Sequence, residues 1–388
     1  MDLKNIIAAI ALSAAVIVLY GLFFAPSQKQ VTEETIERNV ENFSQNSDVP
    51  SLGDNFEIKS ISREDAINSN ERVFFENEFI KGSISLKGGV IDDLELKTYD
   101  KSLGSNEKIK LLNPEGTDQG YSFNTGWATK SDIEMPRADT IWSVEGAKKL
   151  TENNPVKLYH VNNDGIRFEK TISIDEKYLF KIKQTLINNS DSTFKFYPYA
   201  IINRNNLPAD LTDFYILHEG YTFITGDDVE EVDYDDVKEK KYSKQGSSGV
   251  LIQGDKYWMT SIIPKQGRKF RFDLDYKEKY RASYIDLDGY EARPKTIIEH
   301  NVKSLIGAKK IKQINKYKEE LNIEKLDLIV NYGVLYFIIV PMHKILSYFF
   351  NFTGNYGYAI ILLTILVRLV FFPLNQYSMK SMGKMKSL

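Results

Sequence analysis

Two long apolar segments, one near each end of the chain, limit most strongly what this sequence can fold into. Residues 6–25 contain no charged side chain, and residues 356–372 are apolar apart from Thr364 and Arg368. An apolar helix of about 20 residues is long enough to cross the hydrocarbon core of a bilayer. We therefore predict transmembrane helices at 6–25 and 354–373, although the overall content of 27% charged residues is typical of a soluble protein.

The first segment has one alternative, a signal peptide that is cleaved after export. Cleavage requires small residues at the last and third-last positions of the peptide. Here Ala25 follows Phe24, and the bulky Phe23 occupies the third-last position. This pattern, together with the length of the segment, favours an uncleaved anchor.

Positive charge predicts the orientation of the second span. The residues after it carry no acidic side chain and three lysines, Lys380, Lys384 and Lys386. Because Lys and Arg are enriched on the cytoplasmic side of spans, we predict that 374–388 lies in the cytoplasm. With two spans, residues 1–5 are then cytoplasmic too and 26–352 is external; Lys4 agrees with this orientation, whereas Asp2 weakens it.

The external segment begins with a polar stretch. Residues 26–70 are rich in Glu, Asn, Ser, Gln and Asp and show no apolar periodicity. Such a composition cannot bury enough apolar surface to offset the entropy of ordering. We predict a flexible periplasmic linker; a short helix that opens at Thr32 is the alternative.

Residues 71–305 change to a period-two pattern, which is typical of half-buried strands. In one run, apolar and charged residues alternate: Phe270, Arg271, Phe272, Asp273 and Leu274. Gly, Asn and Asp residues separate these runs, as expected for turns. The pattern predicts a large antiparallel β-domain, a sandwich or a similar fold.

This β-domain shows no residue pattern that catalysis or metal binding requires. The chain has no cysteine, which excludes disulfides and thiolate chemistry. His160, His218 and His300 lack the spacing of zinc ligands. The acidic residues of 227–236 lack the glycine and final glutamate of an EF-hand, so we interpret them as a solvated loop, with calcium binding as the weaker alternative. We predict no catalytic residue, cofactor or metal, and the net charge of −3 gives no support for a nucleic-acid partner.

The pattern becomes helical between the β-domain and the second span. Residues 306–332 carry apolar side chains at helical spacing between lysines, which predicts a connecting helix and linker. Residues 333–352 are apolar with a narrow polar stripe, His343, Ser347 and Asn351. We predict an amphipathic helix in the outer membrane–water interface. The alternative, a further span, would place Lys344 near the bilayer centre at a cost of about 2.5–3.5 kcal/mol.

Arg368 within the second predicted span has two interpretations. It lies near the end of the span, so its long side chain can reach the cytoplasmic headgroups. Alternatively it faces a polar, water-containing cavity inside the membrane, with the Thr364 hydroxyl on the same face one turn away. These physical arguments do not decide between the two.

Several short motifs favour the second interpretation of Arg368, a polar cavity inside the membrane. Most of them follow one another near the C-terminus: Leu326-Asp327-Leu328, Gly354-Asn355-Tyr356-Gly357, Thr364, Val367-Arg368, Pro373-Leu374 and Ser381-Met382-Gly383-Lys384-Met385. With Phe168-Glu169-Lys170-Thr171 upstream, they resemble the YidC/Oxa family of membrane protein insertases, in its Gram-negative form with a large periplasmic domain. The resemblance covers nearly the whole chain and is strongest after Leu326. Since the sequence stops at Leu388, inside the predicted cytoplasmic hairpin, we expect further core spans beyond it.

The resemblance implies a β-supersandwich for the external domain and a place in the bacterial inner membrane. It implies the insertion and folding of integral membrane proteins, independently of the Sec translocon or together with it, rather than an enzymatic reaction. In the family, a membrane arginine that maps to Arg368 lines a hydrophilic groove for nascent proteins, and Thr364 matches a groove-lining position. Nascent membrane proteins, the Sec translocon, the ribosome and the lipid bilayer are the implied partners.

Two other functions compete with this one. A membrane-anchored carbohydrate-binding or mutarotase-like protein is the first, because the family's outer domain resembles sugar-mutarotase folds. Fold likeness alone says little about function, and no acid–base pair is visible. A two-span sensor is the second, but it leaves Arg368 and the basic tail unexplained.

Overall fold

The structure is a computed structural model that describes residues 61–102, 104–208, 211, 218–330 and 336–386. The predicted first span at 6–25 and most of the predicted linker, up to residue 60, lie outside the described residues.

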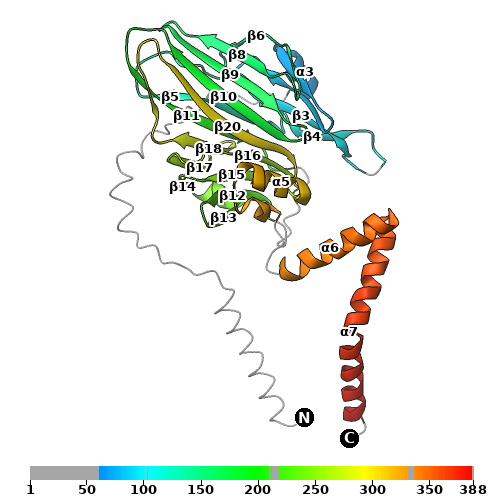
Figure 1. The fold of residues 1–388 in the computed structure, drawn as a ribbon. Helices are drawn as coiled ribbons and strands as arrows, with labels where there is room; N and C mark the ends of the chain where they lie inside the picture. Colours follow the sequence, from blue (N-terminus) through cyan, green and yellow to red (C-terminus); the bar gives the residue numbers. More distant parts are fainter. Residues whose placement is uncertain (1–60, 103, 209–210, 212–217, 331–335, 387–388) are drawn as a thin grey trace, which may run out of the picture. The chain divides into compact units, whose positions relative to one another are not determined.

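Two large β-sheets contain the strands between Arg72 and Ala308 (Figure 1). The 11-stranded sheet contains β1 (Arg72–Glu76), β2 (Ile80–Ser85), β3 (Val90–Asp100), β4 (Lys108–Leu112), β5 (Tyr121–Thr129), β7 (Lys149–Leu150), β11 (Phe194–Arg204), β14 (Tyr242–Gly246), β17 (Phe270–Tyr276), β18 (Tyr280–Asp286) and β19 (Tyr290–Ala292). The 9-stranded sheet contains β6 (Ser143–Glu145), β8 (Val156–Val161), β9 (Ile166–Ile174), β10 (Leu179–Asn188), β12 (Gly220–Thr225), β13 (Asp228–Asp233), β15 (Gly249–Gly254), β16 (Trp258–Ile262) and β20 (Ile297–Ala308).

The strand order mixes neighbours and distant segments. The first sheet runs β14-β17-β18-β11-β5-β3-β2-β1-β7, with β19 beside β11 and β4 beside β3. The second runs β13-β12-β15-β16-β20-β10-β9-β8-β6. Among the described strands the pairs are antiparallel, except that β1 pairs with β7 in parallel. The predicted antiparallel β-fold is confirmed, together with helices toward the C-terminus, one of which is apolar.

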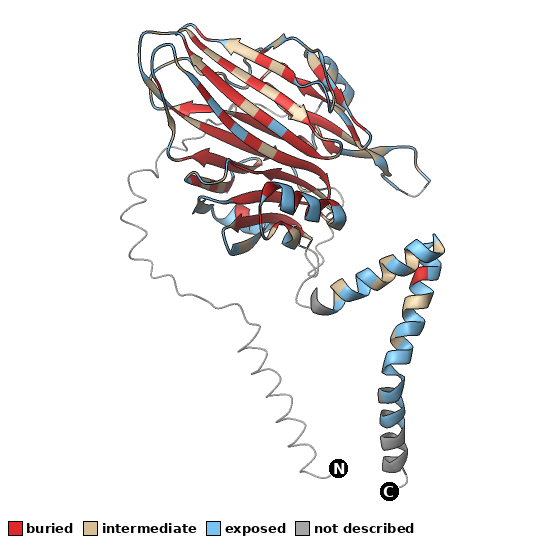
Figure 2. Cartoon of the chain, in the orientation of Figure 1, coloured by how far each residue is buried: buried red, intermediate tan, exposed pale blue. Residues whose placement is uncertain are grey.

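The alternation in the sequence becomes the two faces of each strand. In β17, Phe270, Phe272 and Leu274 are buried, while Arg271 and Asp273 between them are partly exposed. The inward faces of the two sheets meet in one core, where Phe75 of the first sheet contacts Phe180 of the second edge-to-face at 5.3 Å. Figure 2 shows this burial along the central strands. Burial of these large apolar side chains is the main stabilising term of the fold.

A short helix in the predicted linker differs from the expectation. Helix α3 (Arg63–Asn68) begins after Ser62, whose hydroxyl accepts a hydrogen bond from the backbone of Asp65 at 3.1 Å. Its Arg63 forms an ion pair with Asp93 of β3 and donates to Asn113. The sequence did not predict this helix, because it has no periodic apolar face. Polar contacts with residues distant along the chain hold it, and little apolar surface is buried.

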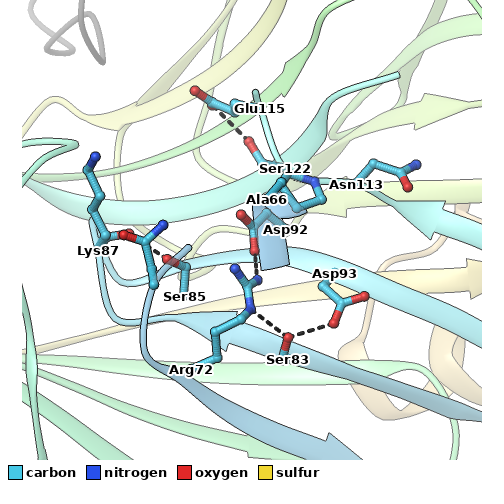
Figure 3. A network of polar contacts seen from close by, with 12 residues as sticks. Ala66, Arg72, Ser83, Ser85, Lys87, Asp92, Asp93, Asn113, Glu115 and Ser122 are labelled. Carbon is cyan, nitrogen blue, oxygen red and sulfur yellow. Dashed lines mark hydrogen bonds and ion pairs between the residues drawn. The ribbon is translucent and has the colours of Figure 1, made fainter. Parts of the chain in front are cut away.

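The polar contacts near α3 continue into the first sheet (Figure 3). Arg72 of β1 pairs with Asp92 of β3 and donates to Ser83 at 2.7 Å, and Ser83 donates to Asp93 at 2.6 Å. The Arg72 side chain is only 3% exposed, so this ion pair is largely shielded from solvent.

The acidic segment 227–236 is not the solvated loop that we expected. It forms strand β13 and the start of α4 (Tyr234–Glu239). β13 pairs along its whole length with β12, and Val232, Tyr234 and Val237 are buried. Burial of these three side chains stabilises the folded segment despite its acidic composition, because most of its carboxylates remain exposed to solvent.

The predicted connecting helix is present and packs against the second sheet. Helix α5 (Ile311–Leu321) and the short 3₁₀ helix η2 (Leu326–Ile329) bury Ile314, Tyr317 and Leu326 in a separate apolar cluster with strand residues. The Tyr317 hydroxyl donates to Asp175 at 2.6 Å and accepts from the Tyr178 backbone at 3.2 Å. The chain is therefore fixed to the β-domain up to the end of η2.

Two further helices follow. Helix α6 (Tyr336–Thr353) continues through Pro341, and α7 (Tyr356–Lys386) is a single helix that contains Pro373. They meet at a sharp turn at Gly354, which has φ = +66°, a conformation that glycine adopts at little cost (Figure 1).

Candidate functional site

Helix α7 carries the two residues that the sequence singled out. Among the described residues, it is the one helix long and apolar enough to cross a membrane, over the 18 residues Tyr356–Pro373, with a mean hydropathy of 1.9. Its side chains are mostly exposed, as Figure 2 shows, and therefore available to lipid or to other helices. This agrees with the predicted second span.

Thr364 and Arg368 lie on one face of α7. Four residues in an α-helix correspond to slightly more than one turn and a rise of about 6 Å. Both side chains are exposed, and the Thr364 hydroxyl donates to the carbonyl oxygen of Ile360 at 2.8 Å. That bond satisfies the hydroxyl within its own helix, so Thr364 adds a polar oxygen to this face at little cost in an apolar medium.

Arg368 has no carboxylate partner among the described residues. No acidic residue follows Asp327 in the sequence, so neither α6 nor α7 can supply one. Before the basic end of α7, these helices instead carry Lys344 and Arg368, for which neither helix supplies a counterion. An unpaired cation in hydrocarbon is costly and requires water, headgroups or an acidic group from another segment.

The three side chains of the predicted polar stripe of α6 differ in their exposure. His343 and Asn351 are exposed, and Ser347 is partly buried. The helix is a separate element from α7, as the prediction of an interfacial helix requires.

The turn between α6 and α7 contains contacts that the sequence analysis missed. The rings of Phe350 and Tyr356 stack at 4.0 Å across the turn. Asn355 accepts a hydrogen bond from the Gly357 backbone at 2.7 Å, which caps the first turn of α7. The signal was present in Gly354-Asn355, a left-handed glycine followed by a preferred capping residue.

Comparison with known families agrees with this geometry. The family described as "YidC periplasmic domain" matches residues 72–345, and the family described as "60Kd inner membrane protein" matches residues 348–388. The membrane protein insertase YidC of Pelagibacter ubique is 47% identical over 390 residues, which cover 100% of this chain and 69% of that protein. This chain belongs to the YidC family of membrane protein insertases.

Further YidC relatives support the same assignment. The membrane protein insertase YidC of Rickettsia felis is 33% identical over 403 residues, covering 100% of this chain and 70% of that protein. The resemblance predicted from the sequence motifs is thus confirmed, and the relatives' names favour the insertase over the sugar-binding alternative.

Solved structures are more distant. A galactose mutarotase related enzyme from Lactobacillus acidophilus shares 12% identity with a TM-score of 0.43, covering 61% of this chain and 97% of that chain. A crystal structure of an active YidC insertase shares 12% identity with a TM-score of 0.28, covering 82% of this chain and 59% of that chain.

Proposed function

We propose that this protein inserts membrane proteins into a bacterial inner membrane, and that the face of α7 with Thr364 and Arg368 contacts the incoming segment. The observation that supports the site is a single arginine, without a carboxylate partner among the described residues, within the apolar and mostly exposed stretch Tyr356–Pro373 of α7. Family membership supports the function.

The proposed mechanism is physical and needs no covalent step. Arg368 and Thr364 line a hydrophilic groove that holds water inside the membrane. The polar flank of a substrate enters this groove, and its acidic groups are attracted by the guanidinium. The apolar segment then moves sideways into lipid, driven by the removal of its surface from water.

We also propose that the β-domain lies outside the cytoplasm and the end of α7 inside it. The basic residues of the tail support this orientation, and no acidic residue opposes them. Helix α6 then lies in the outer interface, where its exposed aromatic residues, such as Tyr348, suit the headgroup region. The first span at 6–25 anchors the N-terminal end.

The Sec translocon and the ribosome are proposed partners, since substrates arrive from both in this function. A photo-reactive amino acid in place of Thr364 should crosslink to a nascent membrane protein stalled during synthesis. The same amino acid at exposed Tyr377, beyond Pro373, tests whether the contact is confined to the apolar part of α7.

An insertion assay at equal expression tests the role of Arg368. Arg368→Lys keeps a cation on a long side chain and should retain most of the activity. Arg368→Ala should fold, because removing a charge from a membrane helix is not destabilising in itself, but it should reduce the insertion of substrates with acidic flanks at least several-fold. Equal, wild-type-like activity of the two variants would mean that Arg368 only contacts the headgroups and has no role in insertion.

A matched control is available on the β-domain. Arg293→Ala removes a 71% exposed arginine from the same chain and should leave insertion unchanged. Loss of insertion in this control as well would mean that the assay responds to net charge rather than to the α7 face.

A further inference from the structure

Inside the β-domain, a small cavity lies beside a buried cation. Residues of both sheets line it, including Lys170 and Gln184 of the 9-stranded sheet and Trp127 of the 11-stranded sheet, together with Trp142 from the segment before β6. Its volume is about 20 Å³. A site of this size holds a small ion or one or two waters and excludes a sugar ring.

Lys170 is 3% exposed and is held by neutral groups only. Its ammonium donates to the Asn124 side-chain oxygen at 2.7 Å and to the Gly89 carbonyl at 3.1 Å, and it lies 4.7 Å from the centre of the Trp142 ring. Burial lowers the pKa of Lys170 to about 7, and no carboxylate of the described chain offsets this effect. When Lys170 is protonated, the core thus holds a cation without a counterion among the described residues.

Three of the residues that line the same cavity have unpartnered donors. Gln184 lies directly opposite Lys170 in the β9–β10 register and is 0% exposed, and neither atom of its amide has a protein partner in the described chain. The indole nitrogens of Trp127 and Trp142, also buried, have none either within the described residues. A buried donor without a partner costs about 1–3 kcal/mol, so three around one cavity require an occupant.

The balance of donors and acceptors selects the kind of occupant. Two indoles and the amide nitrogen of Gln184 donate, whereas the Gln184 oxygen is the one unpartnered side-chain acceptor among them. A water molecule needs acceptors for its own two hydrogens, but an anion only accepts. We propose that this cavity binds one small monovalent anion, of the size of chloride or formate, which compensates the charge of Lys170 and accepts the indole and amide hydrogens.

The three tryptophans of the chain provide the test, because one lies outside the cavity. The complete chain in lipid nanodiscs, with ¹⁵N in its indole groups, gives three indole N–H resonances. Sodium formate and sodium chloride are titrated separately, with bulky gluconate keeping the ionic strength constant. We expect the Trp127 and Trp142 resonances to shift and saturate, while that of Trp258 on β16 stays in place.

Two outcomes would overturn the proposal. The absence of a saturable shift with either anion would mean that water fills the cavity. Equal, linear shifts of all three resonances would mean a general salt effect. If only one of the two anions saturates the shift, the proposal holds and that anion defines the shape of the site.

Variants connect the response to the cavity. Gln184→Glu places a carboxylate opposite Lys170 and should abolish the response, because the protein then carries its own anion. Gln184→Leu removes one donor and should weaken anion binding at least tenfold. Lys183→Gln, at an exposed site on the other face of β10, should leave the response unchanged. Lys170→Met removes the cation and should also abolish the response. If that variant does not fold, Gln184→Glu decides alone, and an unchanged response in it would contradict the proposal.

Discussion

The Nε2 atom of His300 lies 3.1 Å from the hydroxyl of Tyr284, and this contact crosses the interior of the sandwich from β20 to β18. The other ring nitrogen, Nδ1, lies 3.1 Å from the hydroxyl of Tyr290. A neutral imidazole can donate to one tyrosine and accept from the other, whereas an imidazolium can only donate. Burial in the core, away from water, favours this neutral form of His300.

The first prediction concerns acid stability. Burial lowers the pKa of His300 to about 3, although Asp286 nearby acts in the opposite direction. The unfolded chain takes up this proton near pH 6.5 and the folded chain only near 3, so the stabilisation is complete above 6.5 and is lost as the pH falls. At pH 4 the loss should be on the order of 3 kcal/mol.

Thermal unfolding followed by circular dichroism between pH 4 and 8 measures this effect. His300→Gln keeps hydrogen-bonding capacity but cannot titrate, so its melting temperature should fall less between pH 6.5 and 4 than that of the wild type. Asp92, whose pKa burial raises to about 6, titrates in both proteins and cancels in the comparison. Parallel pH profiles would show that His300 does not govern acid stability.

The second prediction concerns the buried Arg72–Asp92 ion pair of Figure 3. Asp92→Asn leaves a guanidinium that is 3% exposed without a counterion and should cost about 3 kcal/mol of unfolding free energy at pH 7.5. Folded Asp92 takes up a proton near pH 6, whereas the unfolded carboxyl does so only near 3.8, so the wild type gains stability as the pH falls from 7.5 to 5 and the variant does not. The difference between the two proteins should therefore grow at pH 5.

Chemical denaturation at the two pH values tests this, with Glu299→Gln as the control. Glu299 pairs with Lys183 at 2.7 Å, but both side chains are about half exposed, so its loss should cost less than about 1 kcal/mol. The prediction fails if the two variants cost the same, or if the cost of Asp92→Asn does not depend on pH.

The third prediction concerns the attachment of α5 to the second sheet. Tyr317→Phe removes the donor to Asp175 and the acceptor of the Tyr178 backbone hydrogen, and it keeps the ring in the apolar cluster. We expect a loss of about 1–2 kcal/mol in unfolding free energy. Lys316→Ala on the exposed side of α5 should change it little. A loss in Lys316→Ala equal to that in Tyr317→Phe would mean that helix propensity, rather than docking, is measured.

The fourth prediction concerns topology, and the absence of native cysteine makes the experiment simple. A single cysteine in place of exposed Ser192, in the turn after β10, should react with a membrane-impermeant maleimide added outside spheroplasts. A cysteine in place of Ser387 should react only after the membrane is opened. The opposite labelling pattern would reverse the proposed orientation.

Sequence patterns predicted the elements whose structure is local. The alternation in 270–274 gave β17, and the lysine-flanked helical spacing gave α5. Helix α3 and strand β13 were not predicted, because distant partners fix them: Asp93 pairs with Arg63, and β12 pairs with β13. Likewise, Thr364 and Arg368 could be placed on one helical face by spacing alone, since a helix has a fixed period.

The sequence alone determined which segments suit a membrane and which form strands, since length, hydropathy and period depend only on neighbouring residues. Period two even places Lys170 on the inward face of β9, between Phe168 and Ile172. Only the tertiary structure decided what surrounds that cation. Its partners, Asn124 and the Gly89 carbonyl, lie on the opposite sheet and in the turn before β3, far away along the chain. Whether a buried charge is paired depends on which strands face each other, and that follows from packing of the whole domain, not from the local pattern.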